Sequence, residues 1–331
     1  MNIPLSADRT EEFRRNALLE DLLADVNADL APGESQLVEH YLGAKMEFPL
    51  VLILGPLRSG TTLFMQWLAS TGMVAYPTNL LSRFYAAPII GARVQLLLTD
   101  PRYRFRDEIE AFSLPVEFRS DNGKTSGALS PNEFWYFWRR FLPDATLDVW
   151  SDAALRSGMD TDRMQAELVG LMDVFQLPFA AKGMLFNYNI RFLDSVFDKV
   201  LFIRLQRDPV ANVASVLDAR QRQYGDKRQW YSFKIPEYES LQDEEPVSQA
   251  AGQVAYINKA LTEGLRDVDA TRQLSVVYED FCNNPRAVFE ALGAKIGAEA
   301  GPYAGPASFA RTRERVVPDS AAIEKALARY A

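Results

Sequence analysis

Short, continuous apolar runs alternate along the chain with segments whose apolar residues recur every three to four positions. The continuous runs are typical of strands buried on both faces of a parallel sheet, and the recurrence is typical of helices. Buried strands are predicted over 48–54, 180–185, 199–205 and 274–278. Helices are predicted over 61–70, 160–177, 189–197, 208–222, 247–266 and 285–297. This alternation predicts an α/β fold with a doubly wound, mostly parallel sheet flanked by helices.

The two ends of the chain lie outside this alternation. Residues 8–46 are predicted to be helical, because an apolar stripe with helical spacing runs between charged residues. No internal repeat and no linker divides the chain into two parts. We therefore expect one domain over residues 1–331, with N-terminal helices at 8–46 and a C-terminal tail at 298–331.

Two internal segments are rich in aromatic residues. A helix is expected over 131–141, where Pro131 suits a first helical turn. Residues 223–246 form a long loop that is aromatic first and acidic afterwards. Long loops inside compact domains are often lids, so we expect this loop to act as one.

The composition supports a folded domain and narrows its partners. The 331 residues are 48% hydrophobic and 24% charged, which is ordinary for a globular protein with a substantial core. A formal net charge of −8 argues against nucleic-acid binding, which normally requires a basic surface. It does not argue against a small anionic ligand, because a pocket needs only local cations.

The chain has one cysteine, Cys282, and one histidine, His40. These counts exclude an intramolecular disulfide, a cysteine-based zinc cluster and any mechanism that needs two histidines. Residues 1–15 lack the pattern of a secretion signal, and no apolar stretch reaches the roughly 18 residues of a membrane span. We therefore expect a cytoplasmic protein without a membrane span.

The turn after the first predicted strand has the spacing of a phosphate-binding loop. It reads Gly55-Pro-Leu-Arg58-Ser59-Gly60-Thr61-Thr62. Glycines there let successive backbone N–H groups and the next helix N-terminus point at an anion. The loop of nucleoside triphosphatases has lysine where this chain has Thr61, and Arg58 supplies a cation three residues earlier. The pattern therefore favours a donor shorter than a triphosphate, without an obligatory metal.

Two further motifs follow in the second half of the chain. Arg207 ends a predicted strand just before Asp208-Pro209, and Ser215 lies eight residues after Arg207. A guanidinium and a hydroxyl at that separation can hold one phosphate from two sides. Tyr278-Glu-Asp closes the last predicted strand and is followed by Asn284-Pro285 at a helix start.

These three motifs resemble those of sulfotransferases that use 3′-phosphoadenosine 5′-phosphosulfate (PAPS), in the broad bacterial branch of that family. The segment Arg58-Ser59-Gly60-Thr61-Thr62-Leu63 is similar to the family's 5′-phosphosulfate loop. The pair Arg207 and Ser215 is similar to its 3′-phosphate motif, and Tyr278 matches a tyrosine that lies near the adenine in some relatives. The resemblance implies the sulfotransferase fold, with these residues as the donor-binding set.

The resemblance also implies a reaction: transfer of a sulfuryl group from PAPS to a hydroxyl or amine of a small acceptor, with PAP as the product and no metal. An in-line displacement of this kind needs a general base and cations over the transferring group. His40 precedes the loop, whereas the base follows it in relatives, so a carboxylate is favoured. Glu133 lies among aromatic residues that should raise its pKa; Glu117 and Asp107 are the reserves. Lys182 and Arg58 are expected to stabilise charge on the leaving phosphate.

Two other function classes stay open. A nucleotide-dependent kinase or NTPase is disfavoured by Thr61, and an inactive relative would bind PAP without transferring a group. Aromatic residues at 134–138 and 224–238 point to an apolar or ring-bearing acceptor, such as a natural product or small metabolite. The sequence distinguishes neither oxygen from nitrogen acceptors nor the oligomeric state.

Overall fold

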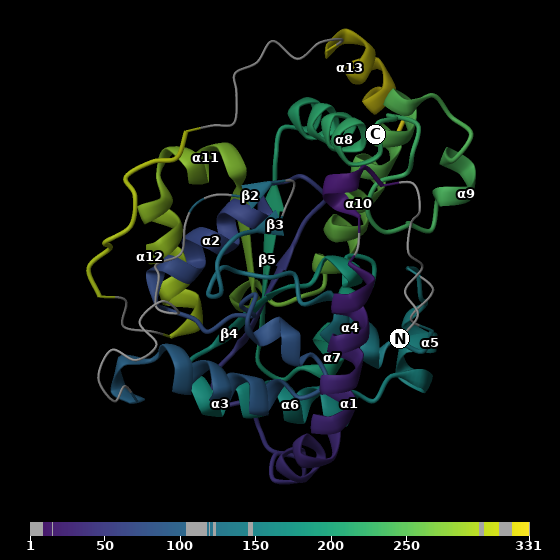
Figure 1. Ribbon diagram of the computed structural model, residues 1–331. Coiled ribbons are helices and arrows are strands. Elements are labelled where there is room, and N and C mark those ends of the chain that lie inside the picture. The colour runs from purple at the N-terminus through teal and green to yellow at the C-terminus, as the bar shows by residue number, and fades with distance from the viewer. Residues whose placement is uncertain are drawn as a thin grey trace.

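The fold is built on a four-stranded parallel sheet (Figure 1). A computed structural model describes residues 9–14, 16–103, 118, 120–121, 124–144, 148–297, 301–310 and 320–330. The strands are β1 (Leu50–Leu54), β4 (Phe179–Lys182), β5 (Val200–Gln206) and β6 (Gln273–Val277). Their order across the sheet is β4-β1-β5-β6, and each neighbouring pair is parallel. The predicted α/β fold with a parallel sheet is confirmed.

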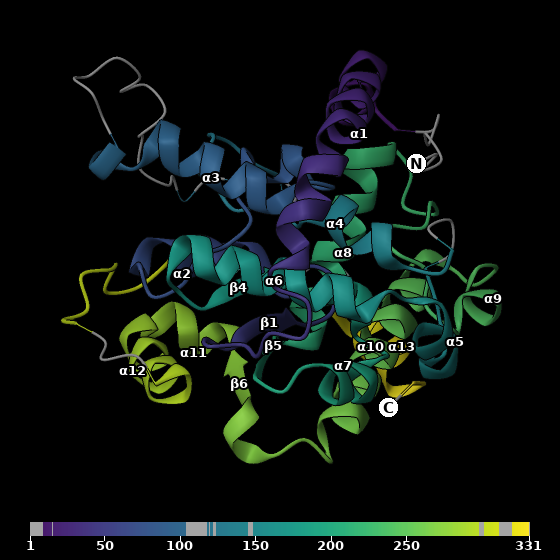
Figure 2. The same ribbon diagram turned by 90° about the horizontal axis from the view of Figure 1, so that it is seen from below.

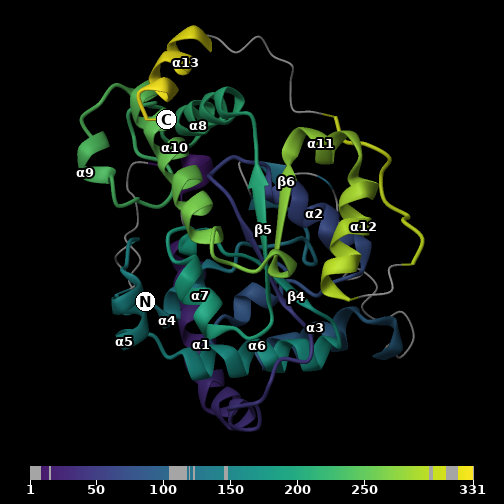
Figure 3. The same cartoon turned by 180° about the vertical axis from the view of Figure 1, so that it is seen from behind.

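Helices cover both faces of the sheet, and β1 shows why. Its alternate side chains point to opposite faces, so Leu52 joins one apolar cluster and Val51 joins another. In Figure 3, α10 and α12 lie on opposite sides of β5 and β6. The first cluster contains side chains from α4 (Trp135–Phe141), α6 (Thr161–Phe175), α7 (Ile190–Val196), α8 (Pro209–Tyr224) and α10 (Pro246–Leu265). The second contains side chains from α2 (Thr61–Thr71), α11 (Tyr278–Asn283) and α12 (Pro285–Ile296).

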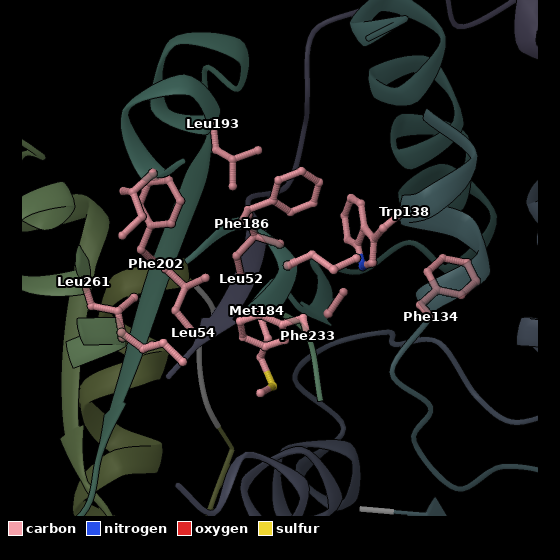
Figure 4. Close-up of a cluster of buried hydrophobic side chains, with 14 of the residues drawn as sticks. Leu52, Leu54, Phe134, Trp138, Met184, Phe186, Leu193, Phe202, Phe233 and Leu261 are labelled. Carbon is pink, nitrogen blue, oxygen red and sulfur yellow. The ribbon is translucent and has the colours of Figure 1, made fainter. Parts of the chain in front are cut away.

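The larger apolar cluster extends from one face of the sheet to the connecting segments that follow the carboxyl ends of the strands. Figure 4 shows Leu52, Leu54 and Phe202 of the sheet in the same cluster as Met184 and Phe233. Because Met184 and Phe233 lie in the connections beyond the strands, the core supports the segments that surround the strand ends.

Helices α1 (Ala17–Glu39) and α3 (Pro88–Thr99) form an outer layer over α6 (Figure 2). The N-terminus of α3 is capped from α1, because Glu34 accepts hydrogen bonds from the backbone of Ile89 and Ile90. No local residue of α3 supplies this cap, and this helix was not predicted. Four more helices were not predicted: α5 (Asp152–Gly158), α9 (Tyr238–Leu241), α11 (Tyr278–Asn283) and α13 (Ser320–Ala328). Of these, α9 lies within the segment 223–246 that was expected to be a loop, and α13 packs on α8 and α10.

The helix expected over 131–141 begins only at Trp135. Pro131 instead forms an isolated bridge with Thr78, and Phe134 has a left-handed backbone with φ of 58°. The expectation that Pro131 opens this helix is therefore wrong, because a long-range backbone contact holds that residue in an extended segment.

Two strand ends also differ from their predicted positions. The strand expected to run to Leu185 ends at Lys182 and is followed by a 3₁₀ turn, Met184–Phe186. The last strand ends at Val277, and Tyr278 begins α11. Both changes place a polar or aromatic side chain at the carboxyl edge of the sheet. Among the helices of the described ranges, none is long and apolar enough to cross a membrane.

Candidate functional site

A hollow lies at the carboxyl edge of the sheet, where the turns after β1, β4 and β5 meet. The chain leaves β1 for β4 on one side and reaches β5 on the other, so this is a topological switch point, the usual ligand position in open α/β sheets. The hollow is lined by Leu57, Arg58, Gly60, Thr61, Thr62, Leu63, Glu133, Trp135, Met184, Arg207, Tyr231, Ser232 and Tyr278.

The loop between β1 and α2 requires glycine at position 60. Gly60 has φ of +96°, a left-handed backbone that side chains disfavour. A Cβ atom there would stand 2.2 Å from Cδ2 of Tyr278. Because α2 begins at Thr61, the glycine also lets the helix N-terminus, with its unpaired N–H groups, face the hollow.

Side chains from other elements hold the carbonyl groups of this loop. Asn187 Nδ2 donates to the Gly55 oxygen at 2.9 Å, and Asn212 Nδ2 donates to the Leu57 oxygen at 2.7 Å. Arg207 Nη1 donates to the Arg58 oxygen at 2.7 Å. The loop is therefore fixed before any ligand arrives. Sequence reasoning gave no such role to either asparagine, although Asn212 lies three residues before Ser215 on α8.

The structure brings together Arg58, Arg207 and Ser215, which the sequence motifs had placed in one set. Arg58 Nε donates to Ser215 Oγ at 3.2 Å across 157 positions of sequence. Arg207 lines the hollow, and its Nε atom is buried without a hydrogen-bond partner in the described part of the chain. Burial lowers the pKa of the Arg207 guanidinium, which nonetheless stays charged. Ser215 lies just outside the hollow, behind Arg58.

The Tyr278 ring packs against residues of both cationic motifs, Arg207 and Gly60. It is 5% exposed, and the Arg207 guanidinium lies 4.9 Å from its ring centroid. The same ring faces the α-carbon of Gly60. A contact between Tyr278 and an adenine stays a prediction, whereas its ring packs against Arg207 and Gly60.

The loop hydroxyls have different surroundings. Ser59 is fully buried, so its side chain does not reach the hollow. The Thr61 hydroxyl points at the Met184 sulfur, 3.8 Å away. Thr62 Oγ1 accepts a hydrogen bond of 2.9 Å from Lys182 Nζ, which links the loop to the end of β4. Leu63 adds an apolar side to the hollow.

Lys182 also pairs with Glu133, at 3.0 Å between Nζ and Oε1. The other Glu133 oxygen accepts a hydrogen bond from the Trp135 indole N–H. Burial raises the pKa of the Glu133 carboxyl, but the Lys182 charge, these two hydrogen bonds and Arg58 together lower it below its ordinary value. The expectation of a raised pKa at Glu133 is therefore wrong, because the aromatic surroundings come with a buried ammonium.

The other candidate bases lie elsewhere. His40 caps the C-terminus of α1 and is exposed, with Nδ1 2.9 Å from the Gln36 oxygen. It is not among the described residues that line the hollow. Asp107 and Glu117 lie outside the described residues.

Strained backbone is concentrated at the hollow. Four described residues other than glycine have a left-handed φ, and three of them are Arg58 (62°), Phe134 (58°) and Ser232 (71°). Arg58 and Ser232 line the hollow, and Phe134 lies between the lining residues Glu133 and Trp135. Each such conformation costs roughly 1–3 kcal/mol and is typical of functional sites.

Sequence reasoning missed several lining residues. Trp135, Met184, Tyr231 and Ser232 come from segments that were noted only as aromatic or apolar. The aromatic character of residues 224–238 was a usable signal, but it did not indicate which side chain faces the hollow. Tyr231 does, and it interacts there with Arg58.

Comparisons with known proteins agree on one family. A sequence profile described as "Sulfotransferase family" matches residues 49–302. Sulfotransferase STF9 from Mycobacterium avium has a similar structure, with a TM-score of 0.50 and 16% identity over 90% of this chain and 76% of that one. Sulfotransferase STF1 from Mycobacterium tuberculosis H37Rv gives a TM-score of 0.50 and 13% identity, covering 94% of this chain and 76% of that one. These identities support a shared fold alone. No curated protein sequence matches the chain.

Proposed function

The chain belongs to the sulfotransferase family, and on that premise we propose that it transfers a sulfuryl group from PAPS to a hydroxyl or amine of a small-molecule acceptor. One observation carries the choice of donor. The loop after β1 and the start of α8 meet through Arg58, Ser215 and Arg207, and the guanidinium groups of both motifs line one hollow. A donor with phosphate groups on the 3′ and 5′ positions of one ribose matches that arrangement.

The residues present fit such a donor. Arg58 and Arg207 donate hydrogen bonds to neutral acceptors, the Ser215 hydroxyl and the Arg58 carbonyl, and neither guanidinium is held by an ion pair within the described residues. The buried Arg207 Nε has no partner in the described residues and would find one in a phosphate oxygen. Gly60 lines the hollow just before α2 begins at Thr61, so the backbone N–H groups of the helix N-terminus can receive a phosphosulfate there.

The reaction is a displacement at sulfur. The acceptor oxygen or nitrogen forms a bond to sulfur while the bond between sulfur and the 5′-phosphate oxygen breaks, and PAP leaves with that electron pair. The acceptor loses one proton, and Glu133 is the base that takes it at a carboxylate oxygen. Arg58 and the amide groups at the start of α2 stabilise the charge that develops on the oxygens.

Lys182 lies between the loop that binds the donor and the proposed base Glu133. Its ammonium group contacts Thr62 in the loop and Glu133 on the acceptor side, within 3.0 Å of each. When Lys182 turns its hydrogen bond toward the leaving phosphate oxygen, the interaction that lowers the pKa of Glu133 weakens. Glu133 then becomes a stronger base while negative charge grows on the leaving group.

The acceptor side of the hollow is formed by Trp135, Tyr231 and Ser232 next to Glu133. Two aromatic side chains and one hydroxyl favour a small molecule with a ring or apolar body and one polar end. We therefore propose a metabolite or natural product of that character as the acceptor.

The donor assignment is tested by thermal unfolding with ligands. PAP should raise the melting temperature far more than ATP with magnesium does. Arg207→Lys should remove most of that rise, because lysine lacks the planar guanidinium group that binds a phosphate through two hydrogen bonds. Arg191→Lys on exposed α7 is the matched control. Equal protection by ATP with magnesium would count against the proposal. Release of PAP from PAPS, with phenols, alcohols and amines as acceptors, then separates an enzyme from a protein that only binds PAP.

A further inference from the structure

One wall of the hollow is formed by Tyr231 and Ser232, from the segment 223–246 that was expected to be a lid. Several contacts hold this wall in place. Tyr231 and Ser232 line the hollow, whereas Phe233, the next residue, is 4% exposed and belongs to the apolar core (Figure 4). Ser232 has φ of 71°, so the chain turns sharply between the two environments. The segment around Ser232 is therefore anchored in the core on one side; that residues 223–246 act as a lid stays a prediction.

A buried polar cluster fixes the backbone of this wall. It consists of Arg220 on α8 with Gln249 and Gln253 on α10, which are 0%, 4% and 0% exposed. Gln253 Nε2 donates to the Tyr231 oxygen at 3.1 Å and lies 3.4 Å from the Phe233 oxygen. The cluster therefore grips the chain on both sides of Ser232.

Arg220 holds the cluster together without a counterion. Its Nη1 atom donates to Gln249 Oε1 at 2.8 Å and to the Lys227 oxygen at 3.2 Å, and Nη2 lies 3.5 Å from Gln253 Oε1. Its guanidinium stands 5.5 Å from the Trp230 ring centroid. No carboxylate of the described residues lies within ion-pair distance, and burial lowers the pKa of Arg220 to about 10. An interior arginine on neutral partners is costly, which indicates a role beyond filling space.

The side chain that this wall presents interacts with a residue of the donor set. Tyr231 and Arg58 line the same hollow; burial raises the pKa of the Tyr231 hydroxyl, and the Arg58 charge opposes that rise. Arg58 Nε also donates to Ser215 Oγ at 3.2 Å. Arg58 therefore has one hydrogen-bond partner from α8, Ser215, and shares the hollow with the tyrosine that the wall presents. A long arginine side chain loses less freedom on binding an anion when its surroundings are already fixed.

We propose that Tyr231 is a positioning residue for the donor, which holds Arg58 in its anion-binding orientation, and that the Arg220–Gln249–Gln253 cluster fixes Tyr231 for this task. The inference rests on the proposed function, because the anion that Arg58 receives is taken to be the donor. It goes further by assigning a role to a tyrosine and a buried cluster that the three motifs do not include.

The test measures the affinity for PAP by isothermal titration calorimetry. Tyr231→Phe removes only the hydroxyl and should weaken PAP binding about tenfold, the loss typical of one hydrogen bond to a charged group. Tyr238→Phe is the matched control, since Tyr238, at the start of α9 (Tyr238–Leu241), packs on Trp230 and is not among the described residues that line the hollow. Gln253→Met, which keeps the side-chain volume, should weaken binding in the same direction.

The decisive measurement repeats Tyr231→Phe in an Arg58→Met background. If Tyr231 acts through Arg58, the second change should alter PAP affinity by less than about twofold there. The same tenfold loss in both backgrounds would overturn the inference, and so would unchanged affinity of Tyr231→Phe in the otherwise natural chain. Failure of the unmodified protein to bind PAP would overturn the proposed function itself, so the two failures are distinguishable.

Discussion

Glu34 provides a test of the packing between the outer helices and the domain. The residue is fully buried on α1, and its two carboxylate oxygens accept hydrogen bonds from the Ile89 and Ile90 backbone at 2.7 and 3.0 Å. Burial raises the pKa of the Glu34 carboxyl to about 6, despite those two hydrogen bonds, and the nearby Glu167 charge raises it further. Arg140 acts in the opposite direction.

The magnitude follows from proton linkage. A carboxyl whose pKa rises from 4.5 in the unfolded chain to about 6 in the folded one holds its proton more tightly in the folded state. Its contribution to stability is fully present below pH 4.5 and is lost as the pH rises through about 6. At about 1.4 kcal/mol for each pKa unit, the loss from this residue is about 2 kcal/mol by neutral pH.

The assay compares the unfolding free energy of the natural chain with that of Glu34→Gln, by urea denaturation between about pH 4 and pH 7.5. The unfolding free energy of the natural chain minus that of Glu34→Gln should fall by about 2 kcal/mol between the low and the high end of this pH range, whatever its absolute value. Glu39→Gln, an exposed carboxylate on the same helix, measures the general effect of removing one negative charge. A difference that stays flat or rises with pH would refute the reasoning.

Three further predictions concern the site and the core. Gly60→Ala, which places a Cβ 2.2 Å from the Tyr278 ring, should weaken PAP binding in calorimetry by more than about tenfold. Gly72→Ala, at the other end of α2 with open space around it, should leave that affinity unchanged and cost about 1 kcal/mol of stability in urea. Glu133→Gln should lower kcat by roughly 100-fold or more in PAPS turnover, with PAP affinity nearly unchanged. Glu167→Gln, which removes the fully buried carboxylate shared by two partly exposed arginines, should lower the unfolding free energy by roughly 3 kcal/mol.

Local patterns were sufficient to predict the elements of the sheet. The strand β1 is buried on both faces, and β5 begins with four buried apolar residues, so these apolar runs were a direct signal. The start of α8 was also predictable, because Asp208 caps it by accepting a hydrogen bond from the Ala211 backbone and Pro209 opens it. In each case the cause of the structure lies within a few residues of the structure itself.

Where the cause is distant, the sequence predicts poorly. The N-terminus of α3 is satisfied by Glu34, 55 positions away from Ile89, so no local cap announces the helix. Pro131 is held extended by its bridge to Thr78, which overrides its preference for a first helical turn. The wall residue Tyr231 is placed by Gln253, 22 positions later in the chain. None of these contacts has a spacing that a single sequence reveals.

In the candidate site, too, features set by nearby residues were predictable and features set by distant residues were not. Each motif predicted its own local geometry, and their meeting through Arg58 and Ser215 follows from the parallel sheet, which brings the ends of β1 and β5 to one edge. The protonation behaviour of Glu133 was predicted with the wrong sign. Aromatic neighbours are visible in the sequence, but the ammonium of Lys182, 49 positions away, is not.

The missing lysine of the phosphate loop has a structural replacement. Thr61 occupies the position of that lysine, and its hydroxyl is turned toward Met184. The cation comes instead from the neighbouring strand, because Lys182 at the end of β4 reaches the adjacent hydroxyl of Thr62. A lysine in the loop would lie along the chain of phosphates, whereas one from β4 stands between the loop and Glu133. Under the proposed function, this position places the Lys182 charge between the leaving phosphate of the donor and the base Glu133, where the sulfuryl group is transferred.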